Sequence, residues 1–98
     1  MVYVFIRHEV QDYDRWRAAF DDALMMRRNA GEASYRAFRD VSKKNEVTIL
    51  CDFDTYDHAR RFLESEDLKT TMKNAGVMGE PIVRYMQEAL SIRRTAAD

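Results

Sequence analysis

The sequence predicts one α+β domain, in which a four-stranded antiparallel sheet packs against helices on one of its faces. Two observations carry this prediction. A strand, a helix cap, a Tyr-Asp pair and an amphipathic helix occur around Tyr13-Asp14 and again around Tyr56-Asp57, which indicates two βα units of equal register. The 98 residues include three glycines and one proline, a composition typical of long regular elements joined by few turns. A chain of this length forms a single core, so we expect one domain over residues 1–93 and a frayed tail at 94–98.

The first half of the chain contains a strand at residues 2–9 and a helix that begins at Asp12. The strand has β-branched and aromatic residues at both alternating sets of positions, so we expect both of its faces to be covered. Asp12 offers a side-chain oxygen to the free amides of the helix. We expect this helix to continue, with an apolar stripe that includes Trp16, as far as Gly31, which suits the left-handed position after a C-cap.

The second half begins with a hairpin. Two strands, a helix and a last strand are expected at residues 34–40, 46–53, 55–76 and 82–92. Ser65 and Glu66 are expected to break or kink this helix, and Gly79-Glu80-Pro81 to form a turn before the last strand. The resulting order, βαββαβ, is that of the ferredoxin-like two-layer sandwich.

The sheet face away from the helices has no cover within the chain, although Tyr3, Phe5 and Leu50 are expected to point there. An exposed aromatic area of several hundred Å2 is rare on a stable monomer. A homodimer with two sheets packed face to face would cover it. The alternation of apolar and polar residues from Met86 to Ile92 predicts a last strand long enough to reach over the partner.

Composition excludes several classes of partner. The formal net charge is −1, with 16 basic and 17 acidic residues, so no strong field attracts nucleic acid or an anionic membrane. The N-terminal apolar run is too short for a signal peptide or a membrane span, which favours the cytoplasm. Cys51 is the single cysteine and has no metal-site spacing with either histidine, so we expect neither a disulfide nor a metal.

The run Val-Phe-Ile-Arg-His-Glu-Val-Gln-Asp-Tyr-Asp-Arg-Trp at residues 4–16 resembles small bacterial proteins called antibiotic biosynthesis monooxygenase-like or cyclase-like proteins. Further similarity lies at residues 27–31, 45–50, 59–60 and 74–77, and the resemblance extends over residues 2–85. It implies a dimeric α/β barrel built from two ferredoxin-like subunits. The wider superfamily includes cofactor-free quinol-forming monooxygenases, polyketide cyclases, muconolactone isomerases and haem-degrading enzymes, so the fold alone does not name a reaction. The Asn, Trp and His set of the haem-degrading enzymes has no match here, and we expect no cofactor.

Two side chains are candidate catalytic residues. His8 shares a strand face with Val4 and Ile6, and its ordinary pKa of about 6.5 makes it the best available general base. In a cofactor-free oxygenase such a base removes a proton from a phenol or quinol, and the electron-rich anion then meets oxygen. Arg27 lies within the apolar stripe of the first helix, where it could hold a carboxylate or enolate oxygen.

Both residues also have structural interpretations. His8 is then a hydrogen-bonded core histidine, and Arg27 a helix-end cation bonded to terminal carbonyls or to Asp52 or Asp54. Four aromatic residues, Tyr13, Trp16, Phe20 and Tyr85, are candidates for substrate binding, although aromatic residues at helical spacing more often form a core.

Two functions therefore remain open. The first is a small-molecule-binding homodimer acting as a cofactor-independent monooxygenase, cyclase or isomerase on a small aromatic or polyketide-like compound. The second is a ligand-binding or structural dimer without turnover. The two copies of the βα unit differ in one respect that bears on this choice. The first copy holds His8, Trp16 and Arg27, so we expect any site to lie there.

Overall fold

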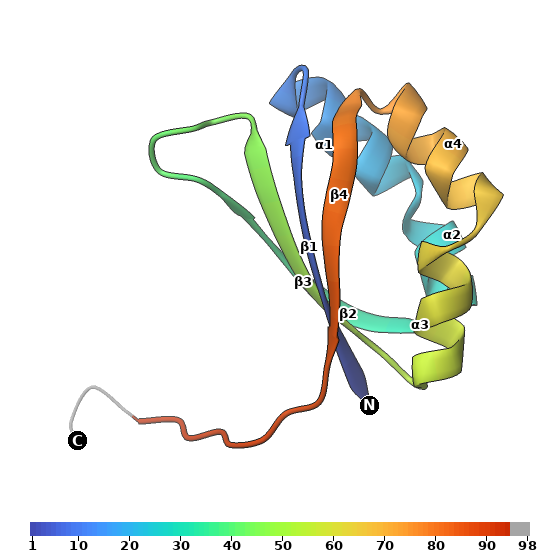
Figure 1. Ribbon diagram of the computed structural model, residues 1–98, viewed down its shortest axis with the longest axis vertical. Coiled ribbons are helices and arrows are strands. Elements are labelled where there is room, and N and C mark those ends of the chain that lie inside the picture. The colour runs from blue at the N-terminus through green and yellow to red at the C-terminus, as the bar shows by residue number, and fades with distance from the viewer. Residues whose placement is uncertain (95–98) are drawn as a thin grey trace.

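The structure, a computed structural model, describes residues 1–94 as a sheet with helices packed on one face (Figure 1). In chain order the elements are β1 (Val2–Val10), α1 (Tyr13–Asp22), α2 (Leu24–Ala30), β2 (Glu32–Arg39), β3 (Glu46–Phe53), α3 (Tyr56–Leu63), α4 (Glu66–Asn74) and β4 (Val77–Met86). The sheet order is β2-β3-β1-β4, with antiparallel neighbours throughout. This arrangement confirms the predicted ferredoxin-like α+β sandwich.

The first helix differs from the prediction, because it is broken at Ala23 rather than continuous to Gly31. Ala23 leaves the helical conformation, with φ −87° and ψ 9°, and separates α1 from α2. The carbonyl of Phe20, which a continuous helix would bond to residue 24, accepts a hydrogen bond from the Arg27 guanidinium. The second helical segment breaks as predicted, and Ser65 Oγ caps α4 by accepting from Leu68 N at 3.2 Å.

The last strand corrects a second expectation. β4 already begins at Val77 and ends at Met86, so the predicted strand over residues 82–92 is wrong at both ends. Gly79-Glu80-Pro81 lies inside β4 as an irregularity rather than a turn, since pairing with β1 shifts register between Arg7 and Glu9. Residues 87–94 have no regular structure, and the segment runs away from the sheet (Figure 1). Most of the predicted tail at 94–98 lies outside the described residues.

The core lies between the sheet and the helices. Alternate residues of β1 and β3 point into it, and all of them are buried: Val2, Val4, Ile6, His8, Val10, Val47, Ile49, Cys51 and Phe53. Among residues 1–94 no helix is long and apolar enough to cross a bilayer.

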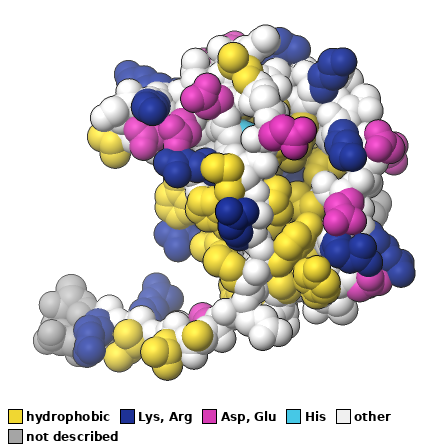
Figure 2. Space-filling view, in the orientation of Figure 1, with side chains coloured by type: hydrophobic (Ala, Val, Ile, Leu, Met, Phe, Trp, Pro, Cys, Tyr) yellow, Lys and Arg dark blue, Asp and Glu magenta, His cyan; other side chains and the backbone are white. Residues whose placement is uncertain are grey.

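The opposite sheet face, called here the open face, lacks a cover from the described residues. Three of its large apolar side chains are well exposed: Phe38, Ile82 and Met86. In Figure 2 hydrophobic side chains gather on the side of β4 away from the helices, with charged side chains around them. The prediction that one face of the sheet is bare is therefore confirmed for residues 1–94.

Candidate functional site

His8 lies on the buried face of β1, opposite Val47 of β3 and close to the end of the strand. Its side chain is 5% exposed, and neither ring nitrogen has a hydrogen-bond partner among the described residues. The imidazole meets the ring of Trp16 edge to face, with the centroids 5.7 Å apart. Burial lowers the pKa of His8 from 6.5 to about 4, so the ring is neutral at pH 7 and has one free donor and one free acceptor.

The irregularity in β4 lies beside His8, because regular pairing of β1 with β4 stops at Arg7 and resumes at Glu9. Pro81 has no amide to donate to the ladder, which is consistent with an interrupted strand at this point. Bulges and register shifts are frequent next to active sites, where they alter the direction of a side chain. The backbone around His8 is thus held on one side by β3 and is irregular on the other.

Arg27 lies in α2 and is also buried, with 5% of its surface exposed. Its Nε donates to Glu32 Oε1 at 3.1 Å, its Nη1 donates to the carbonyl of Phe20, and its guanidinium carbon lies 3.6 Å above the centroid of the Phe20 ring. The third nitrogen, Nη2, is buried without a partner among the described residues. The guanidinium is therefore fixed in place and keeps unpaired N–H groups.

The turn between α2 and β2 brings Glu32 to Arg27. Gly31 ends α2 in the left-handed conformation, with φ 111°, and the next residue begins β2. The sequence suggested Asp52 or Asp54 as the acid for Arg27. Instead Asp52 accepts from Ser34 Oγ at 2.5 Å, and Asp54 pairs with the exposed His58 at 2.9 Å.

Glu32 was missed from the sequence, although it had a local signal. It directly follows the C-cap Gly31, five residues after Arg27 in the last turn of α2. Burial raises the pKa of Glu32, and the hydrogen bond and charge of Arg27 oppose that rise. With a buried cation at 3.1 Å, the carboxylate is the form that the geometry favours at neutral pH.

Cys51 is the other titratable group of this region. Burial raises the pKa of its thiol to about 12, so the sulfur stays protonated, and Sγ donates to the carbonyl of Val4 at 3.7 Å. A protonated, buried thiol is a small apolar side chain rather than a nucleophile.

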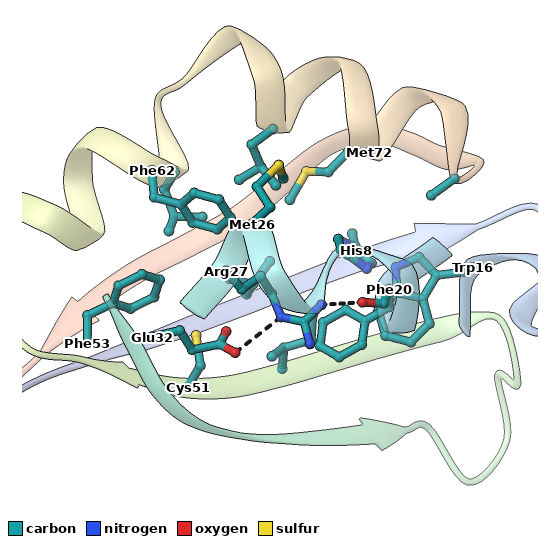
Figure 3. Close-up of a pocket in the computed structure, with 16 residues that line it drawn as sticks. His8, Trp16, Phe20, Met26, Arg27, Glu32, Cys51, Phe53, Phe62 and Met72 are labelled. Carbon is teal, nitrogen blue, oxygen red and sulfur yellow. Dashed lines mark hydrogen bonds and ion pairs between the residues drawn. The ribbon is translucent and has the colours of Figure 1, made fainter. Parts of the chain in front are cut away.

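These residues surround a cavity of about 60 Å3 between the helices and the sheet (Figure 3). Its walls are mainly apolar, and four titratable side chains line it: His8, Arg27, Glu32 and Cys51. A water molecule needs about 10–15 Å3 of such volume, and a cavity that binds benzene has about 150 Å3. The cavity is therefore too small for an aromatic ring in this side-chain arrangement. Met26 and Met72 form part of the wall, and flexible thioether side chains can adjust its size.

The structure brings four of the six predicted site residues together. His8, Trp16, Phe20 and Arg27 all line the cavity, and Trp16 stacks on Phe20 with the ring centroids 4.9 Å apart.

The other two predicted residues, Tyr13 and Tyr85, lie outside the cavity. The ring of Tyr13 lies under the Arg39 guanidinium, 3.7 Å from its carbon, in a groove beside β2. Tyr85 contacts Tyr56 edge to face at 5.3 Å, near the start of α3. Both tyrosines therefore have protein partners away from His8. Within residues 1–94 no three His, Cys, Asp or Glu side chains are grouped as a metal site requires.

Solved structures match this chain over most of its length. A Bordetella bronchiseptica protein provisionally named an antibiotic biosynthesis monooxygenase is 20% identical, with a TM-score of 0.75 over 91% of this chain and 97% of that one. SnoaB, a cofactor-independent oxygenase from Streptomyces nogalater, is 16% identical, with a TM-score of 0.67 over 99% of this chain and 97% of that one. The fold is that of the antibiotic biosynthesis monooxygenases.

This confirms the resemblance in the sequence at the level of the fold. At 20% identity or less, the likeness to antibiotic biosynthesis monooxygenases shows a common architecture and leaves the reaction to the residues of the site. No protein-family model matches the sequence, and no curated protein matches it in sequence.

Proposed function

We propose that this protein is a cytoplasmic homodimer that binds a small molecule in the cavity between His8 and Arg27. One observation carries the proposal: a mostly apolar cavity contains two buried polar side chains with nitrogens that the described residues leave unpaired. A buried donor or acceptor without a partner costs about 1–3 kcal/mol, so such groups normally meet a ligand or water. Trp16 and Phe20 supply the apolar contacts.

A homodimer is proposed from the open face. Phe38, Ile82 and Met86 would lose their exposed surface if two sheets packed together. The chain has a single cysteine, Cys51, which is free and buried, and the absence of an intramolecular disulfide fits a reducing compartment; this is the reason for placing the dimer in the cytoplasm.

The second candidate function is cofactor-independent oxygenation of a small aromatic or polyketide-like compound. The observation that favours it is the neutral imidazole of His8, whose free nitrogen can accept a proton from a hydroxyl group. Arg27 Nη2 would then stabilise the oxygen anion that forms. A histidine with a pKa near 4 is a weak base, so the proton moves only if Arg27 stabilises the product anion strongly. Ring-sized substrates also require Met26 and Met72 to move outward.

The proposed binding is tested on protein purified without denaturation. Native mass spectrometry followed by solvent extraction identifies any molecule that co-purifies, and ¹³C NMR of the protein under dissolved xenon shows whether the cavity admits a small apolar probe. We expect His8→Ala to lose the co-purified molecule and His58→Ala, at an exposed histidine, to keep it. Retention at full occupancy in His8→Ala, or an unchanged xenon spectrum at Trp16 and His8, would contradict the proposal.

Turnover is tested separately by oxygen consumption with simple phenols and quinols. The second candidate expects consumption that His8→Ala and Arg27→Gln both abolish. Equal rates in these variants and in the wild type would exclude a catalytic role for the cavity.

A further inference from the structure

The cavity holds one positive and one negative charge, which cancel. Arg27 supplies the first and Glu32 the second, at 3.1 Å from each other and with side chains that are 6% and 5% exposed. The other two titratable groups that line the cavity, His8 and Cys51, are both neutral at pH 7. A bound anion would therefore add a buried charge without a counter-charge, which costs several kcal/mol.

The hydrogen-bonding groups that remain free suit an uncharged polar ligand. Arg27 Nη2 has N–H groups to donate, and the neutral imidazole of His8 offers one donor and one acceptor. A carbonyl oxygen can accept from Arg27, and a neighbouring N–H or O–H group can donate to His8. Amides and hydroxyketones have both groups on adjacent atoms, and neither is charged at pH 7.

The volume limits the size of such a ligand. The cavity of about 60 Å3 exceeds the about 10–15 Å3 that one water needs and is well below the about 150 Å3 of a cavity that binds benzene, so it suits a ligand of only a few heavy atoms in its present form. Acetamide has four heavy atoms, and acetate has the same shape with a negative charge. These two molecules therefore differ in the one property that the charge balance should distinguish.

We propose that the cavity selects a small uncharged carbonyl compound, such as an amide or hydroxyketone, and rejects the carboxylate of the same shape, because Glu32 already neutralises Arg27. The proposal rests on the proposed binding function and specifies the chemical class of its ligand. The apolar walls contributed by Ile6, Phe20 and Ile49 act in the same direction, since they offer an anion no further donor.

The experiment is a pair of titrations at pH 7 with acetamide and with acetate, followed by the side-chain ¹⁵N signals of His8 and Arg27. We expect saturable shifts with acetamide and binding of acetate weaker by at least about tenfold, since rejection of a buried charge exceeds about 1.4 kcal/mol. Acetate binding as tightly as acetamide, or more tightly, would overturn the inference.

A charge variant tests the reason for this selectivity. Glu32→Gln keeps the size of the side chain and removes its charge, so the cavity becomes positive. The affinity for acetate relative to that for acetamide should then rise by about tenfold or more. Glu46→Gln is the matched control, because Glu46 pairs with Arg7 on the open face and not in the cavity. An unchanged preference in a folded Glu32→Gln protein would overturn the charge-balance argument. If that variant does not fold, the wild-type titrations still decide.

Dissolved xenon separates failure of this inference from failure of the proposed function. Xenon that moves the Trp16 and His8 signals, together with acetamide and acetate that do not, shows an apolar binding cavity and overturns only the inferred ligand class. If xenon and both solutes leave the signals unchanged, the proposed binding function fails together with the inference.

Discussion

His8 combines burial with the absence of a hydrogen-bond partner among the described residues. An imidazole in such surroundings binds a proton poorly, because the charged form would lose its hydration without gaining a carboxylate or a carbonyl. Its ring meets the ring of Trp16 edge to face. The unfolded chain, in contrast, exposes a histidine that titrates near pH 6.5.

This difference predicts that acid destabilises the fold through His8. Between pH 6.5 and pH 4 the unfolded state binds more protons at this residue than the folded state, so the free energy of unfolding falls as the pH is lowered. The contribution is complete above about pH 6.5, and about 3 kcal/mol of it is lost by pH 4. Urea unfolding at a series of pH values measures it.

His8→Phe removes the titrating group and keeps an aromatic ring beside Trp16. We expect this variant to lose the part of the pH dependence between pH 4 and pH 6.5, while His58→Ala retains it because that ring is exposed. The difference between wild type and His8→Phe also separates the effect of His8 from that of Glu32. Because the pKa of Glu32 is raised in the folded state, lowering the pH increases the free energy of unfolding through Glu32. Parallel curves for wild type and His8→Phe would contradict the assignment.

The turn between α2 and β2 is the element that assembles the Arg27–Glu32 pair. A Cβ atom at Gly31 would meet the carboxylate of Asp54 in addition to the strain of a positive φ. At Gly76, with φ 87°, the nearest atom to such a Cβ is 3.6 Å away, so only the backbone strain applies. Substitution of Gly76 therefore tests backbone strain alone, whereas substitution of Gly31 tests backbone strain together with crowding by Asp54.

We expect Gly76→Ala to lower the free energy of unfolding by about 1–2 kcal/mol, the usual cost of a left-handed residue with a Cβ atom. Gly31→Ala should cost more than this, because Asp54 must also move, and should weaken the pairing of Arg27 with Glu32. Urea unfolding gives the first quantity and the Arg27 ¹⁵N signals report the second. Equal losses in the two variants would show that Asp54 does not restrict this turn.

The elements that the sequence predicted well are those with a signal next to their ends. Asp12 and Thr55 each accept a hydrogen bond from a backbone amide two or three residues further on, and each begins a helix close to the predicted place. Ser65 accepts one from Leu68 at the predicted break and caps a separate helix there. The break at Ala23 has no such signal, since it accompanies a hydrogen bond from Arg27, seven residues after Phe20. The bounds of β4 were missed for a similar reason, because pairing with β1 extends it back through residues 79–81.

The same distinction applies to the site. Alternation along β1 placed His8 in the core, and helical spacing placed Arg27 there, so both were predictable. That neither imidazole nitrogen has a hydrogen-bond partner within residues 1–94 is a property of the assembled fold, which the alternation along β1 does not show. Tyr13 has the helical spacing of a cavity residue but contacts Arg39, because β2 lies beside α1.

At the scale of the whole molecule, the open face relates the fold to the proposed dimer. Ile82 pairs with Arg7 across β1 and β4, and both side chains lie on this face. Ile82 is 46% exposed, so a polar substitution there should leave the folded chain intact. Dimer formation would bury Ile82, and a lysine at this position would then be a buried cation without a partner, which disfavours the dimer.

Ile82→Lys is therefore expected to weaken dimerisation by about 3 kcal/mol or more, over a hundredfold, through the cost of burying an unpaired cation. Sedimentation velocity over a range of protein concentrations measures it. Met25→Lys is the matched control, since Met25 is 59% exposed and lies in α2, on the layer away from the open face. A dimer that survives Ile82→Lys but dissociates in Met25→Lys would place the interface on the helices. A wild-type chain that stays monomeric at micromolar concentration would exclude the dimer altogether.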